Sequence, residues 1–236
     1  MPSILAFFCP VDANLRACIR FDEEDVAGTY HDFSGKSNTV NHTNGALVPG
    51  ISNLAAAGIP TATYQMADSA SLDLTSAMTI EAWVRLDSLP SSGRVGIMDN
   101  DGQYGIFVHA GTGLRCTNGI SSLPHIPVST GVWFHMACVW DGTTLGLYLD
   151  GTPVAKMSST GTMATTNTNQ VSLLSSSRAV NERVNGALDN LRVWHSSRTR
   201  AQICADAGLD CVYTVGLADS WQSGLAHSAV AGSNRM

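Results

Sequence analysis

Apolar and polar side chains alternate along the segment Met78–Leu86, where every second residue is apolar. Successive side chains of a β-strand point to opposite faces, so this period of two predicts a strand with one buried face. Residues 132–140 are apolar on both faces, which favours a central strand that is covered on both sides. Asp141 and Gly142 follow and predict a tight turn into a partner strand at residues 145–149.

Asparagine or aspartate followed by glycine recurs along the chain, and such pairs favour the short turns of β-hairpins. The pairs are Asn44-Gly45, Asp101-Gly102, Asn118-Gly119, Asp150-Gly151 and Asn185-Gly186. One short helix is expected near the C-terminus, because Thr199 and Gln202 resemble a capping box and Gly208 ends the segment. We therefore expect an all-β chain of antiparallel hairpins with one short C-terminal helix.

The charge balance excludes some classes of partner. The 236 residues include 13 Lys and Arg against 19 Asp and Glu, which gives a net charge of -6. Because no basic run is present, we expect no nucleic-acid partner. No apolar stretch approaches the roughly 20 residues of a membrane helix, so we also expect no membrane insertion.

The six cysteines fall into three close groups along the sequence, which favours three local disulfides. Six cysteines allow fifteen connectivities, and we choose the pairing by proximity. The expected pairs are Cys9 with Cys18, Cys116 with Cys138, and Cys204 with Cys211. Metal ligation or free thiols are the alternative, but no CxxC motif occurs and no cysteine lies near a histidine at zinc spacing. Disulfides indicate a secreted or cell-surface protein, whose leader sequence is absent from this chain.

Several motifs resemble those of one known family. They are Ser71-Leu-Asp-Leu, Met78-Thr-Ile-Glu-Ala-Trp-Val, Trp133-Phe-His-Met-Ala-Cys-Val-Trp-Asp-Gly, Leu147-Tyr-Leu-Asp-Gly and Gly186-Ala-Leu-Asp-Asn-Leu-Arg-Val-Trp. In this order, over residues 15–207, they resemble the laminin G-like jelly rolls of the concanavalin A-like lectin and glucanase superfamily. The resemblance implies a sandwich of two antiparallel sheets in a single domain over residues 1–215, followed by a tail of uncertain structure over residues 216–236.

The same resemblance implies a function in binding. Its members are secreted or surface-attached modules that bind glycans or proteins, often with a structural calcium ion. We therefore expect a secreted lectin-like module that recognises a glycan or glycoconjugate. A protein-binding adhesion or structural domain is the alternative, and a homo-oligomer can form through a free sheet edge.

A calcium site is expected around Asp189. Alternation along its strand places Asp189 on the face of Leu191 and Val193, toward the core. A buried carboxylate needs a partner, and Ca²⁺ takes oxygen ligands. By the resemblance, the expected ligands of a structural Ca²⁺ are Asp32, Asn38 and Asp189, with Asp22 as a weaker candidate.

The residues leave a second reading of these carboxylates open. Asp189 can instead accept hydrogen bonds from backbone N–H groups, or pair with an arginine such as Arg192 or Arg85. Asp32 can serve only to cap a turn.

A hairpin turn carries the candidate sugar-binding groups. The run Asp99-Asn100-Asp101-Gly102 resembles part of a calcium loop, but Ile97 and Val108 stand where that motif requires acids. We therefore expect an exposed turn whose polar groups can bind sugar hydroxyls, together with Gln103 and Tyr104. Trp194 lies on the polar face of its strand, where it either shields a covering loop or forms a platform for the ligand.

Catalysis is not expected. Glucanases of the superfamily use paired carboxylates, commonly Glu-x-Asp-x-x-Glu on one strand. The run Glu23-Glu24-Asp25 begins this pattern, but Gly28 stands at the place of the final carboxylate. No GxSxG motif is present either. A glycan hydrolase is therefore the least favoured of the three functions.

Overall fold

The computed structural model describes residues 8–22, 28–163, 167–176 and 179–211. Within them, eight strands form a large antiparallel sheet. Its spatial order is β13 (Thr152–Ser158), β12 (Thr144–Leu149), β11 (Trp133–Trp140), β7 (Met78–Leu86), β17 (Gly186–Trp194), β5 (Leu54–Gly58) and β4 (Leu47–Pro49), and β1 (Leu15–Ile19) also pairs with β17. The tail of residues 216–236 and the Glu23-Glu24-Asp25 run lie outside the described residues.

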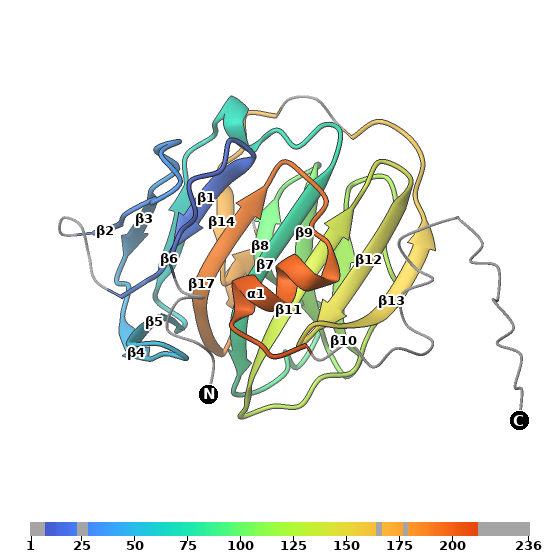
Figure 1. Cartoon of the computed structure of the whole chain (residues 1–236). Coiled ribbons are helices and arrows are strands. Elements are labelled where there is room, and N and C mark those ends of the chain that lie inside the picture. Colours follow the sequence, from blue (N-terminus) through green and yellow to red (C-terminus); the bar gives the residue numbers. More distant parts are fainter. Residues whose placement is uncertain (1–7, 23–27, 164–166, 177–178, 212–236) are drawn as a thin grey trace, which may run out of the picture.

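Seven further strands form a small antiparallel sheet that lies behind the large one in Figure 1. Its order is β10 (Gly113–Thr117), β9 (Tyr104–His109), β8 (Arg94–Asn100), β14 (Val171–Leu173), β6 (Thr63–Met66), β3 (Val40–Thr43) and β2 (Thr29–Tyr30). A short hairpin of β15 (Ser175–Ser176) and β16 (Ala179–Arg183) continues from β14. The two stacked sheets confirm the expected jelly-roll sandwich.

The strands predicted from the sequence are present. β7 has the expected bounds, and β11 is a central strand between β7 and β12. Asp141 and Gly142 turn β11 into β12, and Asp150 with Gly151 turns β12 into β13. Asp150 and Gly151 both have positive φ, as the two-residue turn requires.

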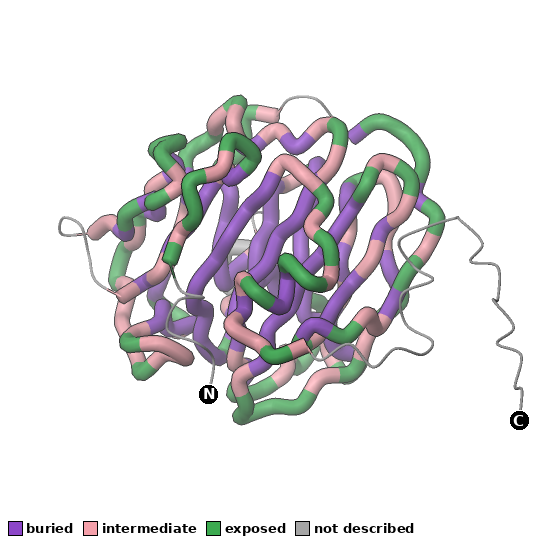
Figure 2. Tube along the Cα trace, viewed as in Figure 1, coloured by how far each residue is buried: buried purple, intermediate pink, exposed green. Residues whose placement is uncertain are grey.

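The main core lies between the sheets. It contains the inward side chains of the large sheet, such as Ile80 and Val84, and those of the small sheet, such as Ile106 and Val108. Figure 2 shows that the central strands are buried along most of their length, whereas the connecting turns are exposed. Both faces of β7 are buried, so the expectation of a single buried face is wrong. The outer face is buried because a helix covers it.

This helix is α1 (Arg200–Ala207), which lies on the outer face of the large sheet, the face opposite the core (Figure 1). Thr199 and Gln202 form the predicted capping box, and Gly208 ends the helix in the left-handed conformation. Ile203 packs against Ala137, Val139 and Tyr148 of the sheet. A 3₁₀ turn at Ala70–Leu72 is the other helical segment among the described residues. None of the described helices is long and apolar enough to span a membrane.

The three predicted disulfides are confirmed. Cys9–Cys18 holds the N-terminal segment against β1, and Cys204–Cys211 holds the chain after α1 against the helix. Cys116–Cys138 joins β10 of the small sheet to β11 of the large sheet. It therefore crosslinks the two layers of the sandwich.

Candidate functional site

The turn between β8 and β9 forms as predicted, but its polar groups face inward. Asn100 donates from Nδ2 to Oε1 of Gln103 at 2.8 Å, and Gln103 donates from Nε2 to Oδ1 of Asp73 at 2.6 Å. The hydroxyl of Tyr104 donates to the carbonyl of Leu72 at 2.8 Å. These contacts fix the turn to the segment that follows the 3₁₀ turn.

The expectation that this turn is exposed is therefore wrong. Four of its candidate residues are buried, and the fifth, Asp101, is half-buried; the buried four are Asp99, Asn100, Gln103 and Tyr104. Asn167 also covers the turn, since its Nδ2 donates to Oδ1 of Asn100 at 2.8 Å. No local pattern in the sequence predicts this contact, because Asn167 lies 67 residues from Asn100.

Trp194 is buried, and Leu15 and Cys18 of β1 pack against it. Its indole Nε1 donates to Oε1 of Glu81 at 2.7 Å, and the guanidinium of Arg198 lies 3.9 Å from the ring centroid. Of the two roles expected for Trp194, the shielding role is the one found. Trp194 has no exposed surface on which a sugar could stack, so its assignment as a ligand platform is wrong.

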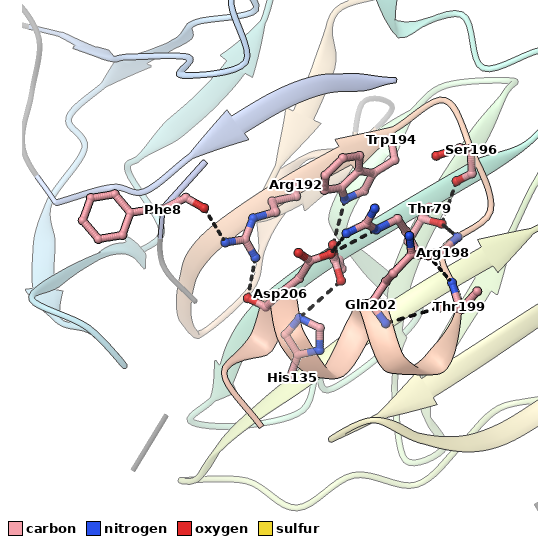
Figure 3. A network of polar contacts seen from close by, with 11 residues as sticks. Phe8, Thr79, His135, Arg192, Trp194, Ser196, Arg198, Thr199, Gln202 and Asp206 are labelled. Carbon is pink, nitrogen blue, oxygen red and sulfur yellow. Dashed lines mark hydrogen bonds and ion pairs between the residues drawn. The ribbon is translucent and has the colours of Figure 1, made fainter. Parts of the chain in front are cut away.

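The groups around Trp194 form a buried polar network that anchors α1 to the large sheet (Figure 3). Arg198 pairs with Oδ2 of Asp206 on α1, and Arg192 donates to the Asp206 carbonyl at 2.6 Å. Burial raises the pKa of Glu81, and the charge of Asp206 adds to the rise. Burial and the charge of Arg192 lower the pKa of His135 to about 3. His135 is therefore neutral, and its 3.8 Å approach to Glu81 is not an ion pair.

Asp189 is buried, but on the outer face of the large sheet. Asn190 and Leu191 together lie opposite one residue of β7, and this bulge shifts the alternation of β17. Leu191 and Val193 point into the core, whereas Asp189 lies beside Trp83. The expectation that Asp189 shares their face is therefore wrong.

The partners of Asp189 are N–H groups. Its Oδ2 accepts from the backbone of Ile51 at 3.0 Å and of Ser52 at 3.3 Å, and its Oδ1 accepts from Nδ2 of Asn190 at 2.9 Å. Burial raises the pKa of Asp189 to about 8, and the nearby charge of Asp22 adds to the rise. The two carboxylates are thus close enough to repel each other.

Asp32 and Asn38 lie together at a different place. The carboxylate of Asp32 accepts from the backbone of Cys18, Ser34 and Asn38 at 2.8–2.9 Å, and from the Ser34 hydroxyl at 2.7 Å. Nδ2 of Asn38 donates to the Arg16 carbonyl at 2.6 Å. Asp32 therefore caps its loop and ties it to β1. Within the described residues, no three acidic, histidine or cysteine side chains form a metal-binding group.

A hollow with a volume of about 190 Å³ opens on the outer face of the large sheet, beside the start of α1. We call it the β12 hollow. It is lined by Val139, Asp141, Thr144, Gly146, Tyr148, Pro153, Ala155, Lys156, Ser197, Arg198 and Thr199. The sequence did not predict this site, because its lining comes from β11, β12, β13 and the loop before α1.

The geometry of β12 explains the hollow. Thr144, Gly146 and Tyr148 alternate onto the outer face, and Gly146 lies directly opposite Val139 of β11. With no side chain at Gly146, the ring of Tyr148 forms one wall of a gap. The glycine between two outward side chains was the one feature of the sequence that indicated a hollow.

Asp141 supplies a charged group at the rim of the hollow. Its Oδ1 accepts from the backbone of Thr143 and Thr144 and from the Thr143 hydroxyl at 2.7–2.9 Å. Burial acts to raise the pKa of Asp141, but these hydrogen bonds outweigh it and hold the pKa below its ordinary value. Asp141 is therefore ionised at neutral pH, and among the described residues no donor bonds its Oδ2.

The fold and the hollow define a two-sheet jelly roll with a candidate ligand site on one sheet. The chain belongs to the concanavalin A-like lectin/glucanase superfamily, whose family model matches residues 59–204, more than half of its length. No curated protein matches the chain in sequence.

Solved structures of low sequence identity share the fold. Domain 4 of AbnA, an extracellular arabinanase from Geobacillus stearothermophilus solved with arabinotriose, is 18% identical, with a TM-score of 0.64 over 82% of this chain and 98% of that domain. The binding domain of Paraclostridial Mosquitocidal Protein 1 is 16% identical, with a TM-score of 0.63 over 80% of this chain and 51% of that one. A Trypanosoma rangeli sialidase is 15% identical, with a TM-score of 0.62 over 86% of this chain and 34% of that one.

Proposed function

We propose that the protein is an exported lectin-like module that binds a saccharide in the β12 hollow. The observation that carries this proposal is the combination of an aromatic wall, Tyr148, with hydrogen-bonding groups around one open cavity. Sugars present apolar C–H faces and many hydroxyl groups, so they fit a site that offers both kinds of contact.

The size of the hollow limits the ligand. Sites for drug-sized ligands measure roughly 300–1,000 Å³, so a cavity of about 190 Å³ holds a small part of a glycan, on the order of one sugar unit. Asp141, Thr144 and Thr199 would bind its hydroxyl groups. The arabinotriose complex of the AbnA domain supports a saccharide ligand for this fold, and the three disulfides support export.

Substitution of Gly146 by valine tests this proposal. A Cβ at Gly146 would lie 3.7 Å from its nearest neighbour, the Ala155 carbonyl oxygen, so the strand accepts a side chain that fills the hollow. Calorimetric titration with neutral arabino-, xylo- and gluco-oligosaccharides should show binding by the unmodified protein and at least about tenfold weaker binding by Gly146→Val.

Thr152→Val is the matched control, because it introduces a valine at an exposed position of β13 that does not line the hollow. It should leave binding unchanged. Equal affinity of the Gly146→Val variant, or failure of every saccharide to bind the unmodified protein, would overturn the proposal.

We propose binding without hydrolysis. Glycosidases need two carboxyl groups that flank the substrate. Among the described residues that line the hollow, Asp141 is the only carboxylate. Glu81 and Asp206 lie close to each other, but Glu81 is 0% exposed, so a substrate cannot reach the pair. Release of shorter saccharides during prolonged incubation with a bound oligosaccharide would contradict this proposal.

A structural calcium ion remains part of the proposal, with a changed set of ligands. Asp32 does not fit, because four hydrogen bonds occupy its carboxylate. Asp22 and Asp189 fit better: their carboxylates are close enough to repel each other, Oδ1 of Asp189 accepts one hydrogen bond, and Oδ1 of Asp22 is buried without a hydrogen-bond partner. A hard cation held by both would remove this repulsion.

Melting with Ca²⁺ or with a chelator tests the ion. Ca²⁺ should raise the melting temperature of the unmodified protein and leave that of Asp189→Asn unchanged. The rise should be larger at about pH 8 than at about pH 6, because Ca²⁺ must displace the proton that the raised pKa retains on Asp189. An equal rise in both proteins would place the ion elsewhere.

A further inference from the structure

A second group of chemically distinctive side chains lies on the outer face of the small sheet, on the opposite side of the sandwich from the β12 hollow. Arg94 of β8 lies directly opposite His109 of β9, and Arg115 of β10 lies directly opposite Phe107 of β9. Directly opposed side chains share a face, and the alternate residues of these strands belong to the core. The ring of exposed His125 lies 4.3 Å from that of His109. We call these five residues the cationic patch.

The sheet holds Arg94 in a defined position. Its guanidinium carbon lies 4.0 Å from the ring centroid of Phe107. The Phe107 ring in turn lies over Gly105, where a Cβ would come within 2.8 Å of it. A stacked guanidinium keeps its in-plane N–H groups free to bind an oxyanion with two parallel hydrogen bonds.

The positive charge of the patch is not balanced within the described residues. Arg20, Arg85 and Arg198 each pair with an aspartate. By contrast, no described carboxylate contacts Arg94 or Arg115. The patch is therefore a local concentration of positive charge on a chain with a net charge of -6.

Two buried nitrogen atoms of the patch also lack partners. Nε of Arg115 and Nε2 of His109 have no hydrogen-bond partner. Burial lowers the pKa of His109 to about 4, and the positive charges of His125, Arg115 and Arg94 contribute to this shift. His109 is therefore neutral at neutral pH, and an anion placed between the two arginines would be attracted by both.

We propose that the cationic patch is a second binding site, for acidic saccharides that carry carboxylate or sulfate groups. Arg94 and Arg115 stand on either side of β9 and two residues apart along it, which separates their backbones by about 12 Å. Two acidic groups of one oligosaccharide can therefore bind the two arginines at the same time. The site is independent of the β12 hollow, although it rests on the proposed function in taking a saccharide as its ligand.

Titration with three hexasaccharides tests the proposal: a heparin fragment with sulfate and carboxylate groups, a hyaluronan fragment with carboxylates alone, and neutral chitohexaose. At least one of the acidic probes should bind through the patch, and the comparison between them tells which acidic group is recognised. Arg94→Gln and Arg115→Gln should each weaken that binding at least about tenfold, as expected for the loss of a charged hydrogen-bonding pair. Both side chains are at least partly exposed, so the variants should fold, and unchanged melting temperatures would verify this.

The controls separate this site from general charge attraction and from the hollow. Lys36→Gln removes one exposed positive charge from the loop around Asp32 and should leave the affinity unchanged. Gly146→Val should also bind the acidic probe normally, so the proposals for the hollow and for the patch are tested independently. In NMR spectra, the bound acidic probe should raise the pKa of His109.

The proposal is overturned if the Arg94→Gln, Arg115→Gln double variant binds the acidic hexasaccharides as tightly as the unmodified protein. An equal loss in Lys36→Gln would show general charge attraction instead. Equally tight binding of poly-glutamate would show that the patch recognises acidic chains of any kind, including peptides, and would also overturn it.

Discussion

The indole of Trp194 on β17 donates a 2.7 Å hydrogen bond to the carboxyl group of Glu81 on β7. The two residues lie 113 positions apart in the sequence and are both fully buried. This bond joins adjacent strands of the large sheet, and the carboxyl group of Asp206 on the helix lies close to the same group of Glu81. Through Glu81, the sheet and the helix are therefore connected.

Trp194→Phe should destabilise the protein by about 1–3 kcal/mol, because it leaves a buried oxygen of Glu81 without its donor. Urea unfolding followed by circular dichroism measures the change. Trp133→Phe is the control, since half-buried Trp133 contacts Arg85 through its ring, which phenylalanine retains in part. Equal losses in both variants would show that the hydrogen bond contributes nothing specific.

Stability should fall as the pH rises from about 6.5 to about 8. The pKa values of Glu81 and Asp189 are both raised by burial, so above their ordinary values the native state holds protons that the unfolded chain has released. The unfolded state therefore gains relative stability with increasing pH until the native groups also ionise. His135 affects the free energy of unfolding only below about pH 6.5, where its lowered pKa makes the stability increase with pH.

Glu81→Gln should reduce this slope, because glutamine preserves an acceptor for Trp194 and does not titrate. Free energies of unfolding from urea titrations at several pH values measure the effect. Asp87→Asn is the control, since Asp87 is an exposed partner of Arg85. An unchanged slope in Glu81→Gln would mean that Glu81 is ionised in the native state.

Removal of the Cys116–Cys138 disulfide should cost about 3 kcal/mol, and removal of Cys204–Cys211 about 2 kcal/mol, if loop closure in the unfolded chain dominates. The sequence separations are 22 and 7 residues. Urea unfolding of the two double alanine variants measures which disulfide contributes more to stability. A larger loss for the shorter loop would show that native packing, rather than chain entropy, determines the contribution of these disulfides.

Asp32→Ala should destabilise the protein by roughly 2–4 kcal/mol, since it leaves the buried N–H groups of Cys18 and Asn38 without acceptors. Hydrogen exchange should show a loss of protection at these two amides. Asp32→Asn retains one acceptor oxygen and should lose less. If chelation of Ca²⁺ reproduced the effect of Asp32→Ala in the unmodified protein, a metal role for Asp32 would regain support.

The parts of the fold that depend on neighbours in sequence could be predicted. The alternation of Met78–Leu86 indicated β7, and the pairs Asp141-Gly142 and Asp150-Gly151 indicated its neighbouring hairpins. The capping box at Thr199 and the glycine at position 208 also predicted the start and the end of α1. These features follow from short-range sterics and hydrogen bonding, which the local residue types determine.

The candidate sites could not be predicted in the same way. The bulge at Asn190 moves Asp189 to the other face of its strand, and no local sequence pattern predicts this bulge. Leu15 and Cys18 pack against Trp194, and Asn167 covers the turn at Asn100. Both covers come from distant segments, so exposure could not be inferred from polarity.

By itself, then, the sequence determined that this chain forms antiparallel hairpins with a short capped helix, closed by three local disulfides. Only the tertiary structure decided which polar groups remain accessible. It placed Gly146 beside the start of α1 to open a hollow, and Arg94 and Arg115 on either side of β9 to form a charged patch. Local periodicity specifies which way a side chain points along one strand, whereas a binding site depends on what several distant segments leave uncovered.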